Sequence, residues 1–443
     1  MDQTSVLIAK YFNARDGELL IGGIPVSVLA DKYGTPLFIY DRQILEHKWS
    51  RLRAALPREF LICYSVKANP TRAVLEFFLR KGAGLEIASG GEFCQALNAG
   101  CPASKIIFAG PGKTEEDLEL VLVGGIGEVH AESAHEVERI LAICQRVGLR
   151  ARIAIRVNPR GEAEGGAMRM GGRPAPFGVD EEVLDAVLDT VLPNARLDFR
   201  GIHLFAGTQI LDVSTLLSQY RQAIEIARRV VKRLGHSLQT VDFGGGLGIP
   251  YFAHENELDT QKLQAVLEEL IREVRNDACF AGTQFVVEPG RYLVGEAGIY
   301  LVRVNDIKVS RGKKYLIVDG GMHHHLAASG NLGQTIKRNY PIAVLNRLGE
   351  PADEIVDVVG PLCTPLDVLA RVIKLPRAQV GDLIGVFQSG AYARSASPLG
   401  FLSHRTPPEV WVEDGQHQLI RERGKNADYI DSLHSGQKIV VTS

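Results

Sequence analysis

The stretch LICYSVKANP, residues Leu61–Pro70, joins an apolar strand pattern to a single charged side chain. Its first residues are apolar or strand-forming, which predicts a short buried β-strand. Lys67 stands where that strand should end, and Asn69-Pro70 would stop the strand. The sequence therefore predicts an ammonium group at the mouth of the protein core.

Seven more strand patterns follow this one, and helical patterns separate them up to about residue 289. The eight strand patterns are LICYS, GLEIA, KIIFA, GEVHA, RIAIRV, GIHLFA, TVDFG and QFVVEP. The clearest amphipathic stretches are TRAVLEFFLRKG, GEFCQALNAG, SAHEVERILAICQRVG and LLSQYRQAIEIARRVVKRLG. This alternation predicts an α/β fold of the (β/α)8 TIM-barrel type. A doubly wound open sheet is the alternative, but eight parallel strands more often close into a barrel.

The character of the sequence changes after Gly298. The stretches IYLVRVNDIKVS, KKYLIVDGG, EIVDVVGPLC and DLIGVFQSGAY are rich in strand formers, with little helical pattern between them. The first 35 residues also look strand-like, in LLIGGIPVSVLADKYGTP. We therefore predict a (β/α)8 barrel domain over residues 36–296 and an all-β domain built from residues 1–35 and 297–443.

Composition narrows the class of protein. The chain has 443 residues, 45% of them hydrophobic and 23% charged, which suits a packed globular core. The formal net charge is −2, so no basic surplus is available to neutralise nucleic-acid phosphates. We expect no membrane span and no signal peptide, because no apolar run is long enough and the N-terminus lacks a basic start. The six cysteines are scattered without CxxC pairs, so we expect a cytoplasmic protein.

In a barrel the carboxyl ends of the strands build the site, and several strand ends here carry polar residues or glycines. His203 and Phe205 lie two apart in the sixth strand pattern, and therefore on one face. Gly244, Gly245 and Gly246 follow the seventh strand, where bare N–H groups can approach an anion; a tight turn is the alternative. The run is not a dinucleotide fingerprint, because no third glycine opens a helix at the required offset.

The eighth strand ends in VEPGR, where Gly290 and Arg291 offer a second arm for the same anion. Glu288 is a carboxylate at a strand end, and an ordinary ion pair with Arg291 is its alternative role. Together with Lys67 these parts fit a phosphorylated aromatic aldehyde, pyridoxal 5'-phosphate, used as an electron sink. Lys67 would form the Schiff base, the glycines and Arg291 would hold the phosphate, and Glu288 would keep a ring nitrogen protonated. The apolar strand beside Lys67 predicts a lowered pKa for its ammonium group.

The motifs YSVKANP, SGGE, VDFGGGLG, EPGR, GPLC and GAY occur in this order along nearly the whole chain. This set resembles the fold-type III pyridoxal-phosphate decarboxylases, the diaminopimelate/ornithine decarboxylase family. The resemblance implies a barrel joined to a β domain. It also implies a homodimer whose active sites lie between the two subunits.

The resemblance further implies roles for single residues. Lys67 resembles the Schiff-base lysine, and Glu288 resembles the partner of the pyridine nitrogen. Cys363 of GPLC is similar to the cysteine that reaches in from the neighbouring subunit to reprotonate Cα, whereas on the residues alone it would be a buried structural thiol. The other cofactor-binding residues that the resemblance implies are Glu86 and Arg156 as a charged pair, Phe205, Thr208, Gly245, Gly246, Gly290, Arg291 and Tyr392.

The chain departs from the family's pattern where the ring and the substrate would bind. Phe205 stands where the family usually stacks a histidine on the cofactor ring. Thr364 follows Cys363, where the family carries an acid that meets a distal amine; a buried ammonium without a counter-charge is strongly disfavoured. Ala327 and Ala328 stand where diaminopimelate decarboxylases carry an arginine. These departures resemble the subgroup that includes the glutamyl-carrier-protein and exosortase-associated decarboxylases.

We therefore expect a carboxy-lyase of amino-acid metabolism that decarboxylates an amino acid, free or delivered on an acyl carrier protein. Thr364 and Arg338 are the expected substrate-side residues, although Lys337 and Arg338 also read as a solvated basic pair. Three rivals stay open: a meso-diaminopimelate decarboxylase of lysine biosynthesis, an amino-acid racemase on a related barrel, and an inactive pyridoxal-phosphate-binding regulatory homologue.

Two other features invite interpretation. His323, His324 and His325 are consecutive, and consecutive residues of a strand point to opposite faces, so we expect no metal there. Residues 159–177 are rich in glycine and proline and follow the fifth strand. They read equally well as a lid over the site and as a plain surface insertion.

Overall fold

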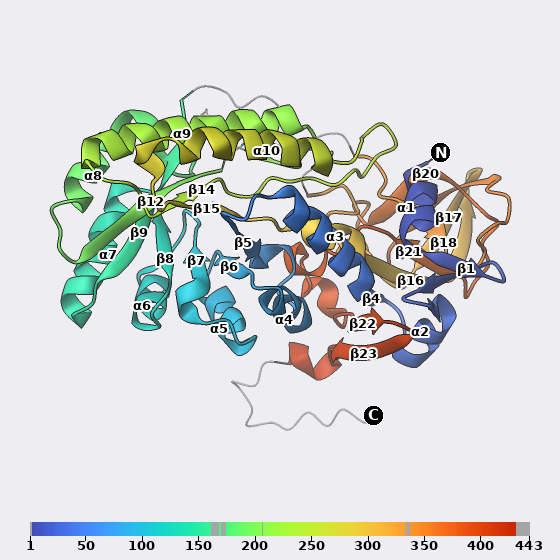
Figure 1. The fold of residues 1–443 in the computed structure, drawn as a ribbon. Helices are drawn as coiled ribbons and strands as arrows, with labels where there is room; N and C mark the ends of the chain where they lie inside the picture. Colours follow the sequence, from blue (N-terminus) through green and yellow to red (C-terminus); the bar gives the residue numbers. More distant parts are fainter. Residues whose placement is uncertain are drawn as a thin grey trace, which may run out of the picture. The chain divides into compact units, whose positions relative to one another are not determined.

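The computed structural model describes residues 2–160, 168–169, 174–205, 207–332, 334 and 337–430. Most of the candidate lid at 159–177 therefore lies outside the described residues. The chain divides into two compact units (Figure 1). The first consists of Met1–Gln3, Gln43–Ala297 and Gly390–Ser395, and the second of Thr4–Arg42, Gly298–Ser389 and Ala396–Ser443.

The first unit contains a closed barrel of eight parallel strands. In barrel order the strands are β5 (Phe60–Ser65), β6 (Gly84–Ile87), β7 (Ile106–Phe108), β8 (Glu128–Ala131), β9 (Ala151–Asn158), β12 (Leu197–Leu204), β14 (Thr240–Asp242) and β15 (Gln284–Val287). β8 pairs with β9, and β15 pairs with β5, so the ring has no free edge. The predicted TIM barrel is confirmed, and the open-sheet alternative is wrong.

Helices separate the barrel strands, as their apolar periodicity predicts. They are α3 (Arg42–Ala55), α4 (Arg72–Arg80), α5 (Gly90–Asn98), α6 (Glu115–Val123), α7 (Ala134–Val147), α8 (Leu184–Val191), α9 (Val213–Leu234), α10 (Thr260–Arg275) and the short α11 (Arg291–Val294). α7 shows why they begin and end where they do. The Ser133 hydroxyl caps its start by accepting from the Glu136 N–H, and Gly148, at φ +73°, ends it in the left-handed region.

The barrel strands contribute both apolar and polar buried side chains. Cys63, Ile107 and Val286 form a buried apolar cluster, with Leu61 packed against it. Burying a side chain of this kind contributes about 1.5–3 kcal/mol to folding. Buried polar residues of neighbouring strands lie at the same level: Glu86 and Glu128 pair with Ile107, and Asp242 pairs with Val286.

The second unit is a sheet with mostly antiparallel pairing. Its strands are β4 (Leu37–Asp41), β16 (Gly298–Ser310), β17 (Lys313–Val318), β18 (Ile342–Val344), β19 (Glu354–Val359), β20 (Val368–Leu375), β21 (Leu383–Val386), β22 (Glu409–Glu413) and β23 (Gln416–Arg421). Seven of them run in the order β20-β19-β17-β16-β4-β22-β23, while β21 pairs with β16 and β18. The predicted β domain is present.

The N-terminal segment is less strand-like than its sequence indicates. It contains α1 (Gln3–Tyr11), the ribbon β1 (Asn13–Arg15), β2 (Glu18–Ile21) and β3 (Ile24–Pro25), and then α2 (Val26–Tyr33). The expected strand character is wrong for α2, because Val26, Leu29 and Ala30 are its buried residues and have helical spacing. Within the described ranges, no helix combines the length and apolar character that crossing a bilayer requires.

Candidate active site

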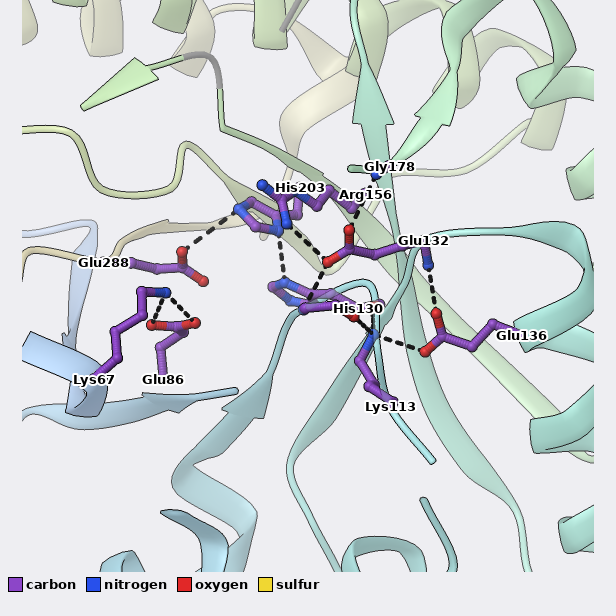
Figure 2. A network of polar contacts seen from close by, with 11 residues as sticks. Lys67, Glu86, Lys113, His130, Glu132, Glu136, Arg156, Gly178, His203 and Glu288 are labelled. Carbon is purple, nitrogen blue, oxygen red and sulfur yellow. Dashed lines mark hydrogen bonds and ion pairs between the residues drawn. The ribbon is translucent and has the colours of Figure 1, made fainter. Parts of the chain in front are cut away.

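Lys67 lies directly after β5, in the 3-10 turn η1 (Val66–Ala68). Its Nζ donates to both carboxylate oxygens of Glu86, at 2.8 and 2.9 Å (Figure 2). Glu86 sits in β6, fully buried, and also accepts from the Ser65 hydroxyl. The Lys67 side chain is 45% exposed. The amine therefore stands at the opening of the barrel with a buried counter-charge beside it.

The charge of Lys67 differs from the sequence-based expectation. Burial is the largest single effect and lowers its pKa, but the charges of Glu86, Tyr392 and Glu288 and the hydrogen bond to Glu86 together outweigh it. The net pKa of Lys67 is raised above its ordinary value, so the expectation of a lowered pKa is wrong. At neutral pH Lys67 is an ammonium ion in this structure, and its activation as a nucleophile depends on a change in the charges around it.

The glycine turn after β14 meets Glu288, which follows β15. The Glu288 N–H donates to the Gly244 carbonyl at 2.8 Å. A Cβ added at Gly245 would lie 2.5 Å from the Glu288 carbonyl oxygen. Gly244 and Gly246 have φ values of +68° and +98°, which side-chain-bearing residues rarely adopt. This turn therefore requires glycine, and its backbone lies against the residue predicted to meet the ring nitrogen.

The EPGR segment also packs against the turn that carries Lys67. A Cβ added at Gly290 would come within 2.9 Å of Ala68 Cβ. Arg291 Nη1 donates to the Tyr251 hydroxyl at 2.8 Å, and its guanidinium carbon lies 4.8 Å from the centre of the Tyr392 ring. The Tyr392 N–H in turn donates to the Ala68 carbonyl at 2.9 Å. Glycine, guanidinium and phenol therefore gather beside the lysine turn.

Arg156 and Phe205 lie next to each other on β9 and after β12. The Arg156 guanidinium carbon is 5.7 Å from the centre of the Phe205 ring and 5.2 Å from that of Phe177. Arg156 Nη1 donates to Glu132 at 2.8 Å, whereas Glu86 pairs with Lys67, and the charge of Arg156 also helps to lower the pKa of Glu86. A Cβ at Gly244 would lie 2.9 Å from Phe205 Cδ2, which places the ring beside the glycine turn.

Thr208 lies in the two-residue strand β13 (Gly207–Thr208), which pairs with β10 (Met168–Arg169). The two strands are antiparallel, and Thr208 is paired with Met168. β13 follows Phe205 by two residues, and Gly246 approaches it closely, since a Cβ there would lie 2.6 Å from the Gly207 carbonyl oxygen. Thr208 therefore neighbours the glycine turn.

Sequence reasoning missed a buried polar network on β8 and the loop that follows it (Figure 2). Glu132 accepts from Arg156, from the Gly110 N–H and from the Gly178 N–H. His130 Nδ1 lies 2.9 Å from His203 Nδ1. A signal was present, because Glu128, His130 and Glu132 alternate along the strand and its end, and alternate residues share a face.

A buried ion pair next to this network joins Lys113, in the loop after β7, to Glu136 of α7. Lys113 Nζ contacts Glu136 of α7 at 2.7 Å and donates to the carbonyls of Gly110 and His130 at 2.7 and 2.8 Å. Neither charged side chain is more than 2% exposed. Burial lowers the pKa of Lys113, and the charge of Glu136 partly offsets that effect. The pair holds the loop after β7 against α7.

The carboxyl groups at the centre of the site hold protons unusually tightly. Burial raises the pKa of Glu288 well above its ordinary value, and the charges of Asp242 and Glu86 raise it further. Burial also raises the pKa of Asp242, to about 6. In contrast, burial and the neighbouring His130 lower the pKa of His203 well below its ordinary value. These surroundings therefore favour the neutral acid at Glu288 and the neutral imidazole at His203.

These features fit a bound pyridoxal phosphate. Glu288 Oε1 is buried and has no hydrogen-bond partner in the part of the chain that the structure describes, so it can serve a ring nitrogen. In the glycine turn the Gly244 N–H donates to the Asp242 side chain at 2.7 Å, so Gly245 and Gly246 are the residues of this turn whose backbone can meet an anion. His130, His203 and Glu288 are also close enough to hold a metal ion, with ligand atoms within 4.8 Å. The 2.9 Å contact between the two histidines is, however, explained by a hydrogen bond.

The remaining predicted site residues lie in the second unit. Cys363 is exposed, and the Thr364 hydroxyl accepts from the Leu366 N–H at 3.3 Å. Arg338 is exposed, and its N–H donates to the Gln334 side chain at 2.7 Å. The fold thus gathers the predicted cofactor residues in the barrel unit and leaves the predicted substrate residues on the β unit.

The three consecutive histidines are buried and lie in a turn, not on a strand. His324 Nδ1 lies 3.1 Å from the Tyr300 hydroxyl, and His325 Nε2 lies 3.0 Å from the Ser389 hydroxyl. Burial lowers the pKa of all three, to about 4 for His323, about 2 for His324 and about 3 for His325. Neutral, packed rings of this kind suit a structural role.

Comparison with known proteins places the chain in a family. Residues 42–295 match the model of the pyridoxal-binding domain of pyridoxal-dependent decarboxylases. The chain is 38% identical to the L-glutamyl-[BtrI acyl-carrier protein] decarboxylase of Niallia circulans, over 91% of this chain and 95% of that one. It is 34% identical to the diaminopimelate decarboxylase of Aquifex aeolicus, over 95% and 96%.

A solved structure agrees with these sequence relatives. The diaminopimelate decarboxylase of M. jannaschii in complex with L-lysine superposes with a TM-score of 0.86, at 26% identity, over 95% of this chain and 96% of that one. The match therefore covers the barrel and the β unit alike. This chain belongs to the pyridoxal-dependent decarboxylases, and it is an enzyme of that family with pyridoxal phosphate as its cofactor.

Proposed function

We propose that this enzyme removes the α-carboxyl group of an amino acid whose far end is held in an uncharged link to an acyl carrier protein. The observation that carries the proposal is Thr364, an uncharged residue directly after Cys363. A free distal ammonium would need a counter-charge at that point, whereas an acyl link needs none. The relative from Niallia circulans, whose name specifies a carrier-bound glutamyl substrate, supports this choice.

The proposed cofactor contacts follow from the geometry of the barrel end. Lys67 would hold the aldehyde, and Phe205 would cover the ring face. Glu288 would meet the ring nitrogen. When bound, pyridoxal phosphate accepts the electron pair that carbon dioxide leaves behind. The phosphate would lie among Thr208, Gly245, Gly246, Gly290, Arg291 and Tyr392, with Glu86 and Arg156 supplying charge beside it.

The rest of the reaction is proposed to need a second subunit. In the proposed homodimer, Cys363 of the partner subunit donates a proton to Cα after carbon dioxide has left. Arg338 is proposed to meet an anionic part of the substrate or of its carrier, since a guanidinium pairs well with phosphate.

The six unpaired thiols support a reducing compartment such as the cytoplasm.

A carbon dioxide release assay tests the substrate proposal. We expect release from aminoacyl groups loaded on an acyl carrier protein, and little from free meso-diaminopimelate. Ordinary enzyme rates on free meso-diaminopimelate would instead establish the second candidate function, diaminopimelate decarboxylase, which the relative from Aquifex aeolicus favours. In the same assay, Thr364→Glu should weaken turnover of the carrier-bound substrate and improve turnover of free diamino acids, because it adds the missing counter-charge.

A further inference from the structure

Four buried side chains form a row across the barrel interior, from β8 to the end of β15. His130 Nε2 lies 3.0 Å from Glu128 Oε1, and His130 Nδ1 lies 2.9 Å from His203 Nδ1. His203 Nε2 lies 3.5 Å from Glu288 Oε2, a contact that is not a hydrogen bond in this structure and becomes one only if the two side chains move closer. Figure 2 shows His203 between His130 and Glu288. All four residues are at most 6% exposed, so solvent does not interrupt the row.

The donors and acceptors along the row can be assigned by starting from Glu128, the first of its four residues. An ionised Glu128 only accepts hydrogen bonds, and the Thr240 hydroxyl already donates to it. His130 Nε2 therefore carries a proton and donates to Glu128. If His130 is neutral, its Nδ1 is a lone pair, so His203 Nδ1 must donate to it. His203 Nε2 then presents a lone pair to Glu288, which suits a protonated carboxyl group.

A second arrangement contains the same number of protons. The Glu288 O–H bond breaks and an N–H bond forms at His203 Nε2. At the same time the N–H bond at His203 Nδ1 breaks and one forms at His130 Nδ1. Glu288 is now a carboxylate that accepts from His203, and His130 is an imidazolium ion beside Glu128. Two protons have each moved by one step, so the net change is one proton transferred from Glu288 to His130 and a new tautomer of His203.

We propose that His203 and His130 are positioning residues that form a two-state proton relay, which couples the charge of Glu288 to a proton held beside Glu128. This inference rests on the proposed contact between Glu288 and the ring nitrogen. In the first arrangement Glu288 is neutral, the state that burial and the neighbouring carboxylates favour. In the second it is the carboxylate that stabilises a protonated ring nitrogen, and His203 donates to it.

The charges around the relay favour the first arrangement before the cofactor binds. Burial, Asp242 and Glu86 raise the pKa of Glu288, while Lys67 lowers it. Burial and nearby positive charge lower the pKa of His203. The titratable groups that face the row are Cys63, Lys67, Glu86, Lys113, Glu132, Arg156 and Asp242. A cationic ring nitrogen next to Glu288 would favour the second arrangement, because its positive charge would stabilise the carboxylate form of Glu288.

The first test reads the histidine tautomers directly, by ¹⁵N NMR of protein labelled in its histidine rings. In the cofactor-free protein we expect a proton on His203 Nδ1 and on His130 Nε2. In the holoenzyme we expect His203 to carry its proton on Nε2 and His130 to carry two. A His203 tautomer that stays the same with and without pyridoxal phosphate would overturn the relay. A stoichiometric metal ion in the purified protein would also overturn the relay if His203→Leu removed it. His130, His203 and Glu288 would then be the ligands of that ion.

The second test follows the ring nitrogen of ¹⁵N-labelled pyridoxal phosphate in the holoenzyme as pH is varied. We expect His203→Leu to lower the midpoint of ring-nitrogen protonation by about one pH unit, the equivalent of one hydrogen bond to a charged group. His203→Gln keeps a donor and should restore most of that shift. His135→Leu, a change at an exposed histidine, is the matched control and should leave the midpoint unchanged.

The two inferences fail in different ways. If Glu288→Gln leaves the ring-nitrogen signal unchanged, the proposed function of Glu288 is wrong. If Glu288→Gln moves that signal but His203→Leu does not, Glu288 has its proposed function and the relay is wrong. Equal midpoints in wild type, His203→Leu and His203→Gln would therefore contradict the relay alone.

Discussion

At the scale of single residues, Glu86 is the neighbour that raises the pKa of Lys67 most. Glu86 keeps the amine protonated in this structure, so its reactive form requires that the pair be rearranged. Lys67→Arg keeps a cation for Glu86 but cannot bond to an aldehyde. We expect this variant to fold and to lose the visible absorbance of the bound cofactor. After borohydride reduction, peptide mass spectrometry should find the cofactor on Lys67 in wild type and on no peptide in the variant. An adduct on another lysine would show that Lys67 does not form the Schiff base with the cofactor.

The raised pKa of Glu288 predicts the direction in which the stability of the cofactor-free protein changes with pH. This raised pKa means that the folded state holds a proton that the unfolded chain releases. The resulting stability is fully present below about pH 4.3, the unfolded value, and is lost as pH rises through the folded value. Urea unfolding of the cofactor-free protein should therefore show wild type losing up to about 1.4 kcal/mol per pH unit above that point. Glu288→Gln should flatten this slope, and Glu269→Gln, at an exposed site, should not.

At the scale of elements, the Lys113–Glu136 pair ties the loop after β7 to α7. Lys113→Met leaves the buried Glu136 carboxylate without its cation. We expect a loss of about 3–5 kcal/mol in the free energy of unfolding, measured with urea. The double variant Lys113→Met/Glu136→Leu removes both charges and should recover a large part of that loss. If the single and double variants are equally destabilised, the pair contributes through shape and not through charge.

The elements also show what the sequence could predict. All eight barrel strands were predictable, because each is a short apolar run and its burial is a local property of the sequence. The glycine turn and Glu288 could be placed because strand ends of a closed barrel converge. The charge of Lys67 could not be predicted, since Glu86 reaches it from the neighbouring strand. The pairing of Arg156 with Glu132 was missed for the same reason: the choice between two acids depends on register.

At the scale of the whole molecule, the barrel unit carries Lys67 and the β unit carries Cys363. The proposal that each active site combines Lys67 of one subunit with Cys363 of its partner makes a numerical prediction. Lys67→Ala alone should be inactive, and Cys363→Ala alone should lose about 10²–10⁴-fold of its rate, the range of one general acid. After the two variants are mixed in equal amounts and allowed to exchange subunits, about half of the dimers contain one of each.

Each mixed dimer would have one site with both residues intact and one site with neither. Mixing should therefore restore about one quarter of the wild-type activity per subunit, since half of the dimers have one of two sites intact. Carbon dioxide release before and after exchange measures this, and the doubly substituted chain mixed with itself is the control. If Lys67 and Cys363 of the same subunit shared a site, every site in every mixed dimer would lack one residue. Mixing would then restore nothing, and the proposed shared site would be wrong.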